Sequence, residues 1–215
     1  MIDMPHREFL KGAYAILGGS FDPIHNGHLY LAKEVLSLSP VHKVILIPSF
    51  HHNFKAEKIV LDYDSRLALA QEAVAHFNPL HFVAYQADDY RIPIEVWDLE
   101  RNQSGYTSDT VKKLQELYPQ QKFALIIGAD NLQKLPEWHE FDWLKQNLHF
   151  IILPRPDCVL PCDVLSQIEH SILDMPLCKI SSSAIRDRIA RDESISGMVP
   201  EALEQRIREL YQKKN

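Results

Sequence analysis

Residues 18–28 read Gly-Gly-Ser-Phe-Asp-Pro-Ile-His-Asn-Gly-His. The apolar run 14–17, Tyr-Ala-Ile-Leu, precedes them and is typical of a buried strand that turns sharply at its carboxyl end. A helix is expected from residue 27 to about residue 38, because apolar residues recur there near helical spacing and Ser39-Pro40 ends the pattern. This stretch therefore predicts a strand, a tight turn and a helix in succession.

Strand and helix patterns continue to alternate up to about residue 153. We expect further strands at 43–48, 80–84, 123–128 and 148–153, and helices at 64–77 and 107–117. This alternation predicts right-handed βαβ units and an α/β fold with a doubly wound, mostly parallel sheet. In such sheets ligands bind beyond the carboxyl ends of the strands.

The pattern changes past residue 154, where prolines punctuate the chain. We expect helices at about 162–173, 182–191 and 200–212, which make a small helical carboxyl-terminal part over about 177–215. Neither an internal repeat nor a linker composition separates a second unit. The sequence therefore predicts one domain over residues 1–215.

The overall composition is that of an ordinary globular protein, with 46% hydrophobic and 24% charged residues. A net charge of −6 provides no general positive field, so we expect no long nucleic acid as a partner. The first residues lack a signal-peptide pattern and no apolar run approaches membrane-spanning length. We therefore expect a cytoplasmic protein with no membrane partner, and the sequence leaves a homo-oligomer open.

The three cysteines are Cys158, Cys162 and Cys178. Their spacing matches neither a C-x-x-C redox pair nor a zinc ribbon, and an odd number cannot pair completely. We expect unpaired thiols.

The turn at residues 18–28 is suited to binding an anion. Small residues let backbone N–H groups approach a ligand closely, and the helix that follows points its positive end at the same place. His25 and His28 are three residues apart, on one side of the helix start, with Gly27 leaving room for a ligand. Two imidazoles in this arrangement can bind phosphate oxygens together.

Other interpretations of this turn remain open at this point. The glycines alone fit a tight βα turn as well as they fit phosphate binding. The patterns G-x-G-x-x-G and G-x-x-x-x-G-K-[ST] are absent, so the usual dinucleotide fold and the P-loop are not supported. The histidine pair could also ligate a metal, but no third His, Cys or carboxylate has a characteristic spacing, and we expect no metal site.

A second candidate site lies at residues 180–186, Ile-Ser-Ser-Ser-Ala-Ile-Arg. Hydroxyl residues open a helix here and Arg186 follows within about its first turn. A helix cap with a surface arginine would explain the pattern in isolation. Free N–H groups, serine hydroxyls and a guanidinium can also converge on phosphate oxygens. Two such anion sites in one chain suggest a polyphosphate ligand.

The two motifs together resemble those of the nucleotidylyltransferase superfamily, which has an H-x-G-H turn and an I-S-S-T-x-I-R helix start. Within it the chain most resembles the bacterial nicotinate-mononucleotide adenylyltransferases. Further matching positions are Arg101, 105–110, 123–130, Leu132, Pro136, Trp138, Arg155-Pro156, Val199-Pro200 and Tyr211. The chain departs from the pattern at Ser183, where threonine is more usual, at Gly105, where serine is usual, and in the segment 51–55.

The resemblance implies a Rossmann-like nucleotidylyltransferase that transfers AMP from ATP to nicotinate mononucleotide, releasing pyrophosphate in NAD biosynthesis. The attacking phosphate is already an anion, so this chemistry needs in-line positioning and charge neutralisation more than a general base. ATP and nicotinate mononucleotide are the implied partners, and Mg²⁺ would be carried mainly by ATP phosphates.

The resemblance also implies a role for individual residues. The catalytic group is His25, His28 and Arg186. The ATP-binding residues are Gly18, Gly19, Ser20, Phe21, Gly128, Asp130, Ser181, Ser182, Ser183 and Ile185. The acceptor-binding residues are Asp22, Lys55, Tyr106, Thr107, Trp138 and Arg155. For His51 and His52 a solvated loop is the preferred interpretation.

Three alternatives remain at this stage. The acceptor could be nicotinamide mononucleotide or another phosphorylated metabolite such as a pantetheine phosphate. The chain could be a nucleotide-binding protein without catalysis, since a fold does not guarantee activity, although both imidazoles and Arg186 are present. A fragment related to class I aminoacyl-tRNA synthetases fits poorly with the acidic net charge.

Overall fold

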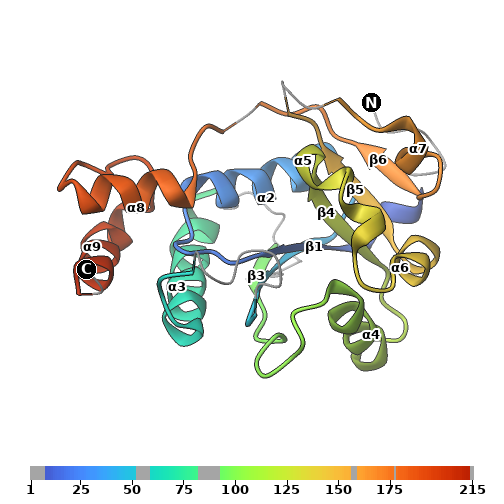
Figure 1. Ribbon diagram of the computed structural model, residues 1–215, viewed down its shortest axis with the longest axis horizontal. Helices are drawn as coiled ribbons and strands as arrows, with labels where there is room; N and C mark the ends of the chain where they lie inside the picture. The colour runs from blue at the N-terminus through green and yellow to red at the C-terminus, as the bar shows by residue number, and fades with distance from the viewer. Residues whose placement is uncertain (1–7, 52–58, 82–92, 156–158, 177, 214–215) are drawn as a thin grey trace.

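The computed structural model describes residues 8–51, 59–81, 93–155, 159–176 and 178–213. Over these residues the chain forms a six-stranded sheet in which every neighbouring pair is parallel (Figure 1). In chain order the strands are β1 (Tyr14–Gly19), β2 (Lys43–Pro48), β3 (Ile94–Val96), β4 (Phe123–Gly128), β5 (His149–Leu153) and β6 (His170–Ile172). The predicted α/β class with a parallel sheet is confirmed.

The strands lie in the order β3-β2-β1-β4-β5-β6. The chain therefore winds outward from β1 in one direction and then returns to β4 and winds outward in the other. This is the doubly wound order of dinucleotide-binding folds, and the order reverses between β1 and β4. Ligands in such folds bind in the crevice outside the carboxyl ends of the two strands at this switch point.

Helices connect the strands and follow the last of them. They are α2 (Asn26–Leu38), α3 (Tyr63–His81), α4 (Thr107–Leu117), α5 (Ala129–Leu132), η2 (Leu135–Glu137), α6 (Phe141–Asn147), α7 (Cys162–Leu165), α8 (Ser182–Ala190), η3 (Glu201–Leu203) and α9 (Glu204–Gln212). In Figure 1, α2 and α4 lie on opposite sides of the sheet. None of the helices in the described ranges is long and apolar enough to span a membrane.

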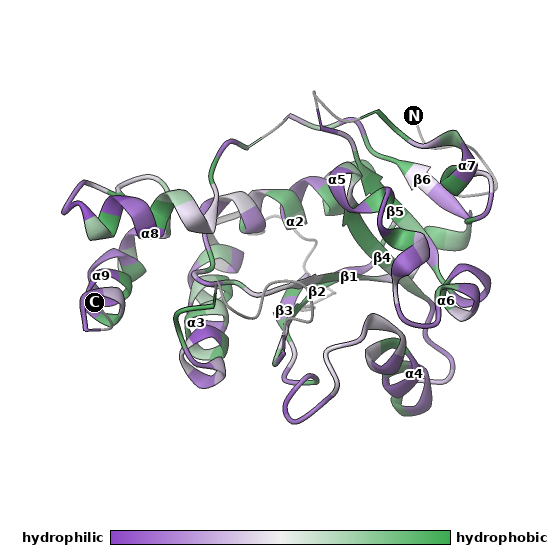
Figure 2. Ribbon diagram, in the orientation of Figure 1, coloured by the Kyte–Doolittle hydropathy of each residue, from purple (hydrophilic) through white to green (hydrophobic). Residues whose placement is uncertain are grey.

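Alternate residues of the strands pack on the two faces of the sheet. In β1, Ala15 and Leu17 belong to one buried cluster together with residues of α2 and α3, whereas Ile16 belongs to a second cluster with residues of α4 and α6. Successive strand side chains point to opposite faces, so a sheet covered on both sides needs apolar residues throughout. Figure 2 shows this pattern, with apolar residues along the central strands and both characters on the helices.

The carboxyl-terminal helices share the first of these clusters. Ile185 and Ile189 of α8, and Ile207 and Tyr211 of α9, are buried in it with residues of α2 and α3. In Figure 1, α8 and α9 lie at the end of the molecule opposite β6. The segment that carries the second anion motif is therefore packed against the helix that follows the first.

The structure corrects two expectations about secondary structure. A strand was expected at 80–84, but α3 continues through Leu80 to His81, and the rest of that range lies outside the described residues. The third strand is instead Ile94–Val96, which pairs with Val44–Leu46 of β2. Helical spacing also predicted a helix over 162–173, but α7 ends at Leu165 and His170–Ile172 form β6. Pairing with Phe150–Ile152 of β5 overrides the local pattern there.

Candidate active site

The turn after β1 is tightly constrained by its own residues. Phe21 has a left-handed backbone conformation with φ 47° and is fully buried, and the peptide bond between Asp22 and Pro23 is cis. His25 is the extended residue that precedes α2, and His28 lies in the first turn of that helix. Gly18 at the end of β1 is open, since a Cβ there would meet no atom within 4 Å. The turn therefore presents backbone and imidazole groups at the switch point of the sheet.

His25 and His28 form a stacked pair. Their ring centroids are 3.7 Å apart and the ring planes meet at 23°. The backbone N–H of His25 donates to Nδ1 of His28 at 3.3 Å, so the neutral His28 ring carries its proton on Nε2. Nδ1 of His25 is buried and has no hydrogen-bond partner among the described residues.

Both imidazoles are neutral near pH 7 in this structure. Burial lowers the pKa of His25 to about 4. Burial, followed by the neighbouring charge of His25, lowers the pKa of His28 well below its usual value. An anionic ligand reverses this balance, because a nearby negative charge favours the protonated ring. The pair is therefore suited to donate to a phosphate and to gain positive charge as it does so.

The second anion motif lies directly against this turn. Ser182 Oγ donates to the carbonyl of Pro23 at 2.9 Å, and Arg186 Nη1 donates to the carbonyl of Asp22 at 2.5 Å. Ser181 caps α8 by accepting the N–H of Ala184 at 3.2 Å. The two predicted anion-binding segments are thus joined by direct hydrogen bonds, although far apart in the sequence.

Ser183 and Ile185 complete this segment. The hydroxyl oxygens of Ser181 and Ser183 are 3.2 Å apart at the exposed start of α8. Ile185 is fully buried in the core cluster that also holds α2. The hydroxyls therefore face outward while the isoleucine anchors the helix beneath them.

Asp22, which the sequence assigned to the acceptor, is almost fully buried. Its carboxylate accepts the N–H of Val60 at 2.8 Å, the N–H of Leu61 at 3.1 Å and the hydroxyl of Tyr211 at 2.6 Å. Arg186 Nη1 lies 3.6 Å from Oδ2 of the same carboxylate. Asp22 therefore ties the turn to α9 and orients Arg186, and whether it also touches the acceptor stays a prediction.

Arg66 of α3 is a buried residue that the sequence argument missed. Its guanidinium donates to the carbonyls of Ser20 at 2.6 Å, Ser49 at 2.9 Å and Leu61 at 3.2 Å. Ser20 directly follows β1, Ser49 directly follows β2, and Leu61 lies in the loop before α3. One side chain therefore holds the carboxyl ends of two strands together. The available signal was an arginine among the alternating Leu and Ala residues of a helix, but such an arginine is usually exposed.

Gly128 and Asp130 lie at the other side of the switch point, at the end of β4. Asp130 forms an ion pair with Arg155, which lies just beyond the end of β5. The distance from Asp130 Oδ1 to Arg155 Nε is 3.1 Å. A Cβ on Gly128 would overlap the Asp130 carboxylate, so glycine is needed for this side chain to fold back. One predicted ATP residue and one predicted acceptor residue are therefore ion-paired here, and both are more than a third exposed.

Of the other predicted acceptor residues, Tyr106 and Thr107 lie at the start of α4. Tyr106 precedes the helix and Thr107 is its first residue. The ring of Tyr106 stacks on His139, with centroids 4.3 Å apart and planes at 17°, and His139 Nδ1 is 3.1 Å from the buried Ser108 Oγ. Trp138 directly precedes His139 and is partly buried against the cluster that contains Val111 and Leu114 of α4. His139 was not singled out in the sequence.

The loop before α4 passes close to His51 at Gly105. Gly105 has φ 78°, and a Cβ there would lie 2.7 Å from the carbonyl oxygen of His51. Two loops therefore approach closely at a position where the sequence departs from the family's usual serine. Lys55 and His52, together with Cys158, lie outside the described residues.

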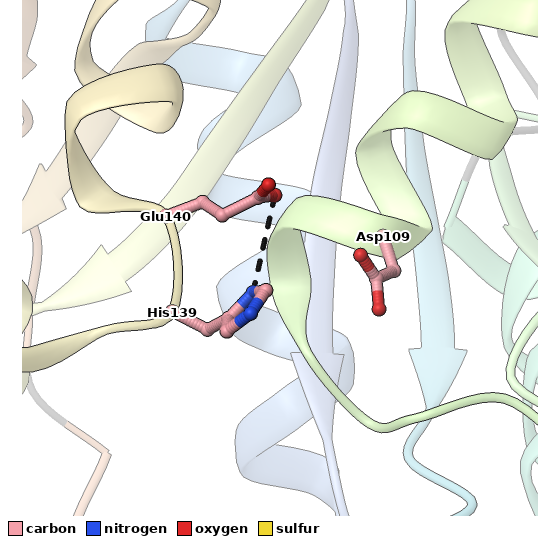
Figure 3. Close-up of side chains that lie close together, drawn as sticks. All are labelled: Asp109, His139 and Glu140. Carbon is pink, nitrogen blue, oxygen red and sulfur yellow. Dashed lines mark ion pairs between the residues drawn. The ribbon is translucent and has the colours of Figure 1, made fainter.

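Asp109, His139 and Glu140 bring three potential metal-ligand atoms within 4.8 Å of one another (Figure 3). The sequence spacing did not indicate this group. Each member has a protein partner, because Ser104 donates to Asp109 and Lys112 pairs with Glu140, while Ser108 bonds His139. These contacts account for the cluster as a link between α4 and the loop before α6.

Comparisons with known proteins agree with this arrangement. A model of the cytidylyltransferase-like family matches residues 16–188, which include both predicted anion-binding segments, so the chain is a protein of this class. A Bacillus pumilus protein named "probable nicotinate-nucleotide adenylyltransferase" is 33% identical over 196 residues, 90% of this chain and 94% of the relative. One of the same name from Saccharopolyspora erythraea is 32% identical, covering 89% and 85%. The chain therefore belongs to the nicotinate-nucleotide adenylyltransferase family.

A solved structure supports the fold independently. Nicotinic acid mononucleotide adenylyltransferase of Plasmodium falciparum, complexed with NaAD, aligns with a TM-score of 0.73 over 94% of this chain and 96% of that one. The sequence identity is 21%, so this likeness concerns the fold. The predicted Rossmann-like nucleotidylyltransferase architecture is confirmed.

Proposed function

We propose that this protein transfers AMP from ATP to nicotinate mononucleotide, forming deamido-NAD and pyrophosphate in NAD biosynthesis. The observation that carries the proposal is the contact between the two anion-binding segments, in which Arg186 and Ser182 bond the carbonyls of Asp22 and Pro23. One segment alone could be a helix cap or a tight turn. Together, at the switch point of the sheet, the two segments offer one guanidinium, two imidazoles and several hydroxyl and N–H donors. We propose that this set of donors binds a triphosphate. The relatives' names support the reaction.

The phosphate of the acceptor attacks the α-phosphorus of ATP, and the bond to the bridging oxygen of pyrophosphate breaks. The nucleophile is an anion, so the protein's task is to align the two substrates and to stabilise charge on the leaving group. His25 and His28 donate to phosphate oxygens from the turn after β1. Burial lowers the pKa of both rings, and a phosphate beside them favours the protonated form, so we expect protonation to accompany nucleotide binding.

The segment at α8 serves the leaving group. Arg186 is fixed by Asp22, and its remaining N–H donors are directed at the β- and γ-phosphates in this proposal. Ser181, Ser182 and Ser183 supply hydroxyls and the free N–H groups of the helix start. Gly18, Gly19, Ser20 and Phe21 line the same phosphates through their backbone, with Ile185 as the anchor of the second segment.

Mg²⁺ would be held mainly by the ATP phosphates and would supply neutralising charge there. Asp22, the buried carboxylate of this turn, already accepts protein donors on both oxygens, so it is not offered as a metal ligand. Asp130 and Gly128 accept the ribose and adenine of ATP at the end of β4. A ligand that takes the Asp130 carboxylate frees Arg155 for the acceptor.

The acceptor lies on the side of α4. The start of this helix offers the N–H of Thr107 to the ring carboxylate, whereas the N–H of Tyr106 already donates to Ser104 Oγ, and Trp138 offers an aromatic face to the pyridine. Lys55 is proposed as a further contact to the acceptor's anionic groups. A cytoplasmic location, where both substrates are available, belongs to the same proposal.

The deciding experiment measures pyrophosphate release from Mg-ATP with nicotinate mononucleotide, nicotinamide mononucleotide or phosphopantetheine supplied separately. Fastest release with nicotinate mononucleotide supports the proposal. Preference for one of the other two would change the acceptor and keep the reaction class. Silence with all three, in a protein that still binds ATP, would indicate a nucleotide-binding protein without this activity.

A further inference from the structure

The start of α3 contacts two segments of the site, the turn after β1, assigned above to the ATP phosphates, and the loop before α4, assigned to the acceptor. Arg66 reaches the first segment, because its Nη1 donates to the carbonyl of Ser20 at 2.6 Å. Tyr63 reaches the second, because its hydroxyl donates to Asp98 Oδ1 at 2.7 Å. Tyr63 and Arg66 are three residues apart and therefore neighbours on the helix surface. One helix end thus connects the two parts of the site.

Arg66 also bonds the backbone that leads from one part to the other. Its Nη2 donates to the carbonyl of Ser49 at 2.9 Å, and the N–H of Ser49 donates to the carbonyl of Gly19 at 2.9 Å. Two residues further along the chain, the carbonyl oxygen of His51 lies so close to Gly105 that a Cβ there would be 2.7 Å from it. Arg66 therefore holds a short path of backbone between the turn after β1 and the loop before α4.

Side-chain contacts strengthen the connection of α3 to the loop before α4. The rings of Phe50 and Tyr63 meet with centroids 5.0 Å apart and planes at 63°. The guanidinium of Arg101 lies 5.1 Å from the Tyr63 ring centroid and pairs with Asp64 and Asp98, each at 2.8 Å. The start of α3 is therefore fixed to this loop by a hydrogen bond, ring contacts and ion pairs together.

The burial of Arg66 shows that packing alone does not account for this side chain. It is 1% exposed, and burial lowers the pKa of its guanidinium, while the charge of Asp22 acts in the opposite direction. Removing a cation from water is costly unless its donors are satisfied. Its hydrogen bonds to the described residues all go to backbone carbonyls of separate segments. Only a planar guanidinium has donors in enough directions to bond three such carbonyls at once.

We propose that Arg66 is a positioning residue that sets the distance and direction between bound ATP and bound acceptor, with Tyr63 as its counterpart toward the loop before α4. This role rests on the proposed function, because it requires two substrates that react with each other. In-line attack needs the acceptor phosphate close to the α-phosphorus of ATP, and a misplacement of about 1 Å can lower the rate about 10²-fold. The three protein carbonyls occupy the Arg66 donors, so it acts through the backbone rather than on a substrate.

Binding of the reaction product separates positioning from a general loss of structure. Deamido-NAD joins the two substrate halves covalently, so it binds tightly only where both half-sites have the correct relative placement. ATP and nicotinate mononucleotide, bound singly, each use one half-site. A displaced half-site therefore weakens binding of the product and leaves each substrate's affinity in place, whereas local unfolding weakens binding of all three ligands.

The experiment compares the wild type with Arg66→Lys and Tyr63→Phe. Lysine keeps the positive charge but cannot bond three carbonyls in separate directions, and phenylalanine keeps the ring but loses the hydrogen bond to Asp98. The matched control is Arg188→Lys, because Arg188 also donates to a backbone carbonyl, that of Ser194 at 3.0 Å, near the end of α8. Titration calorimetry measures binding of deamido-NAD, nicotinate mononucleotide and a non-hydrolysable ATP analogue. Pyrophosphate release gives kcat, and thermal unfolding reports on folding.

We expect Arg66→Lys to bind deamido-NAD at least about tenfold more weakly than the wild type and to have a kcat about 10²-fold lower. Its affinity for either substrate alone should change less than about threefold. Tyr63→Phe should show the same pattern with a loss of about threefold in product affinity, as expected for one hydrogen bond. Arg188→Lys should match the wild type in all of these measurements.

Three results would overturn this role for Arg66. They are wild-type product affinity or kcat in Arg66→Lys, an equal loss of affinity for the product and both substrates, and the same losses in Arg188→Lys. If Arg66→Lys does not fold, Tyr63→Phe decides, and wild-type product affinity in that variant overturns the role. A wild-type protein that neither releases pyrophosphate with any acceptor nor binds deamido-NAD would show instead that the proposed function has failed, and the role of Arg66 would fall with it.

Discussion

The phosphate side and the acceptor side of the site are built in different ways. On the phosphate side, buried groups such as Asp22 and Arg66 bond the backbone of segments distant in the sequence. On the acceptor side, Tyr106 stacks on His139, and Arg155 pairs with Asp130, the proposed ribose contact of ATP; these residues are more than a third exposed. Buried, satisfied networks hold one geometry, whereas exposed pairs are weak and exchange partners readily. The first side is therefore preorganised for the phosphates that we propose it binds, and the second can adjust to the substrate groups proposed to bind there.

The sharpest test of the phosphate side is His28→Ala. Removing a donor aimed at developing charge should lower turnover about 10³-fold, as expected for loss of one such group. Folding should change far less than turnover, because His28 accepts one long hydrogen bond from the His25 backbone and its ring contacts with His25 and Phe21 contribute about 1 kcal/mol each. Pyrophosphate release and thermal unfolding measure the two effects. The exposed His76→Ala is the control, and near-native turnover of His28→Ala would refute the assignment.

The next largest effect concerns stability and separates the two carboxylates directly. Asp22→Asn replaces a buried acceptor of several N–H and O–H donors with a neutral amide beside Arg186, and should lower the free energy of unfolding by about 3 kcal/mol. Asp130→Asn removes an exposed pair and should cost under about 1 kcal/mol. Urea denaturation of both variants gives the comparison. Equal losses would mean that the two sides are not built differently.

The sequence predicted those elements and motifs that have long or distinctive local patterns. The strand at 43–48, the helix at 107–117 and the strand at 123–128 have the predicted bounds, because their apolar patterns are long enough to be unambiguous. The anion motifs at 18–28 and 180–186 were recognisable because glycines, hydroxyls and imidazoles at fixed spacing have few other uses. Their contact with each other required the fold.

What the sequence could not show depends on tertiary contacts. The strands β3 and β6 have three residues each, too few to display a period. The role of Arg66 is visible only in the folded structure, where its guanidinium donates to three carbonyls from separate loops. His139 stacks on Tyr106, which is distant in the chain, so its place in the site could not be predicted from the residues around it. Short elements and groups that act through distant backbone are therefore the parts that sequence patterns miss.

A smaller effect is expected from pH. The unfolded chain protonates His25 near pH 6.5, whereas the folded protein keeps this ring neutral until about pH 4. Lowering the pH through that window favours the unfolded state, so stability present above pH 6.5 is lost on acidification. Between pH 6.5 and 5 the loss due to His25 should be about 2 kcal/mol. Urea denaturation of wild type and His25→Asn measures it, and parallel pH profiles would show that His25 contributes nothing.

The smallest effect tests the adjustable side. Trp138→Ala removes the aromatic face beside α4 and should raise the KM for nicotinate mononucleotide about tenfold, the upper range for an aromatic contact, while the KM for ATP stays constant. Trp143→Ala is a matched control, because both tryptophans are partly buried against the same hydrophobic cluster. A rise in both KM values, or the same rise in Trp143→Ala, would indicate a packing defect. A rise in the KM for nicotinate mononucleotide alone would place the pyridine ring beside Trp138, on the exposed and adjustable side of the site.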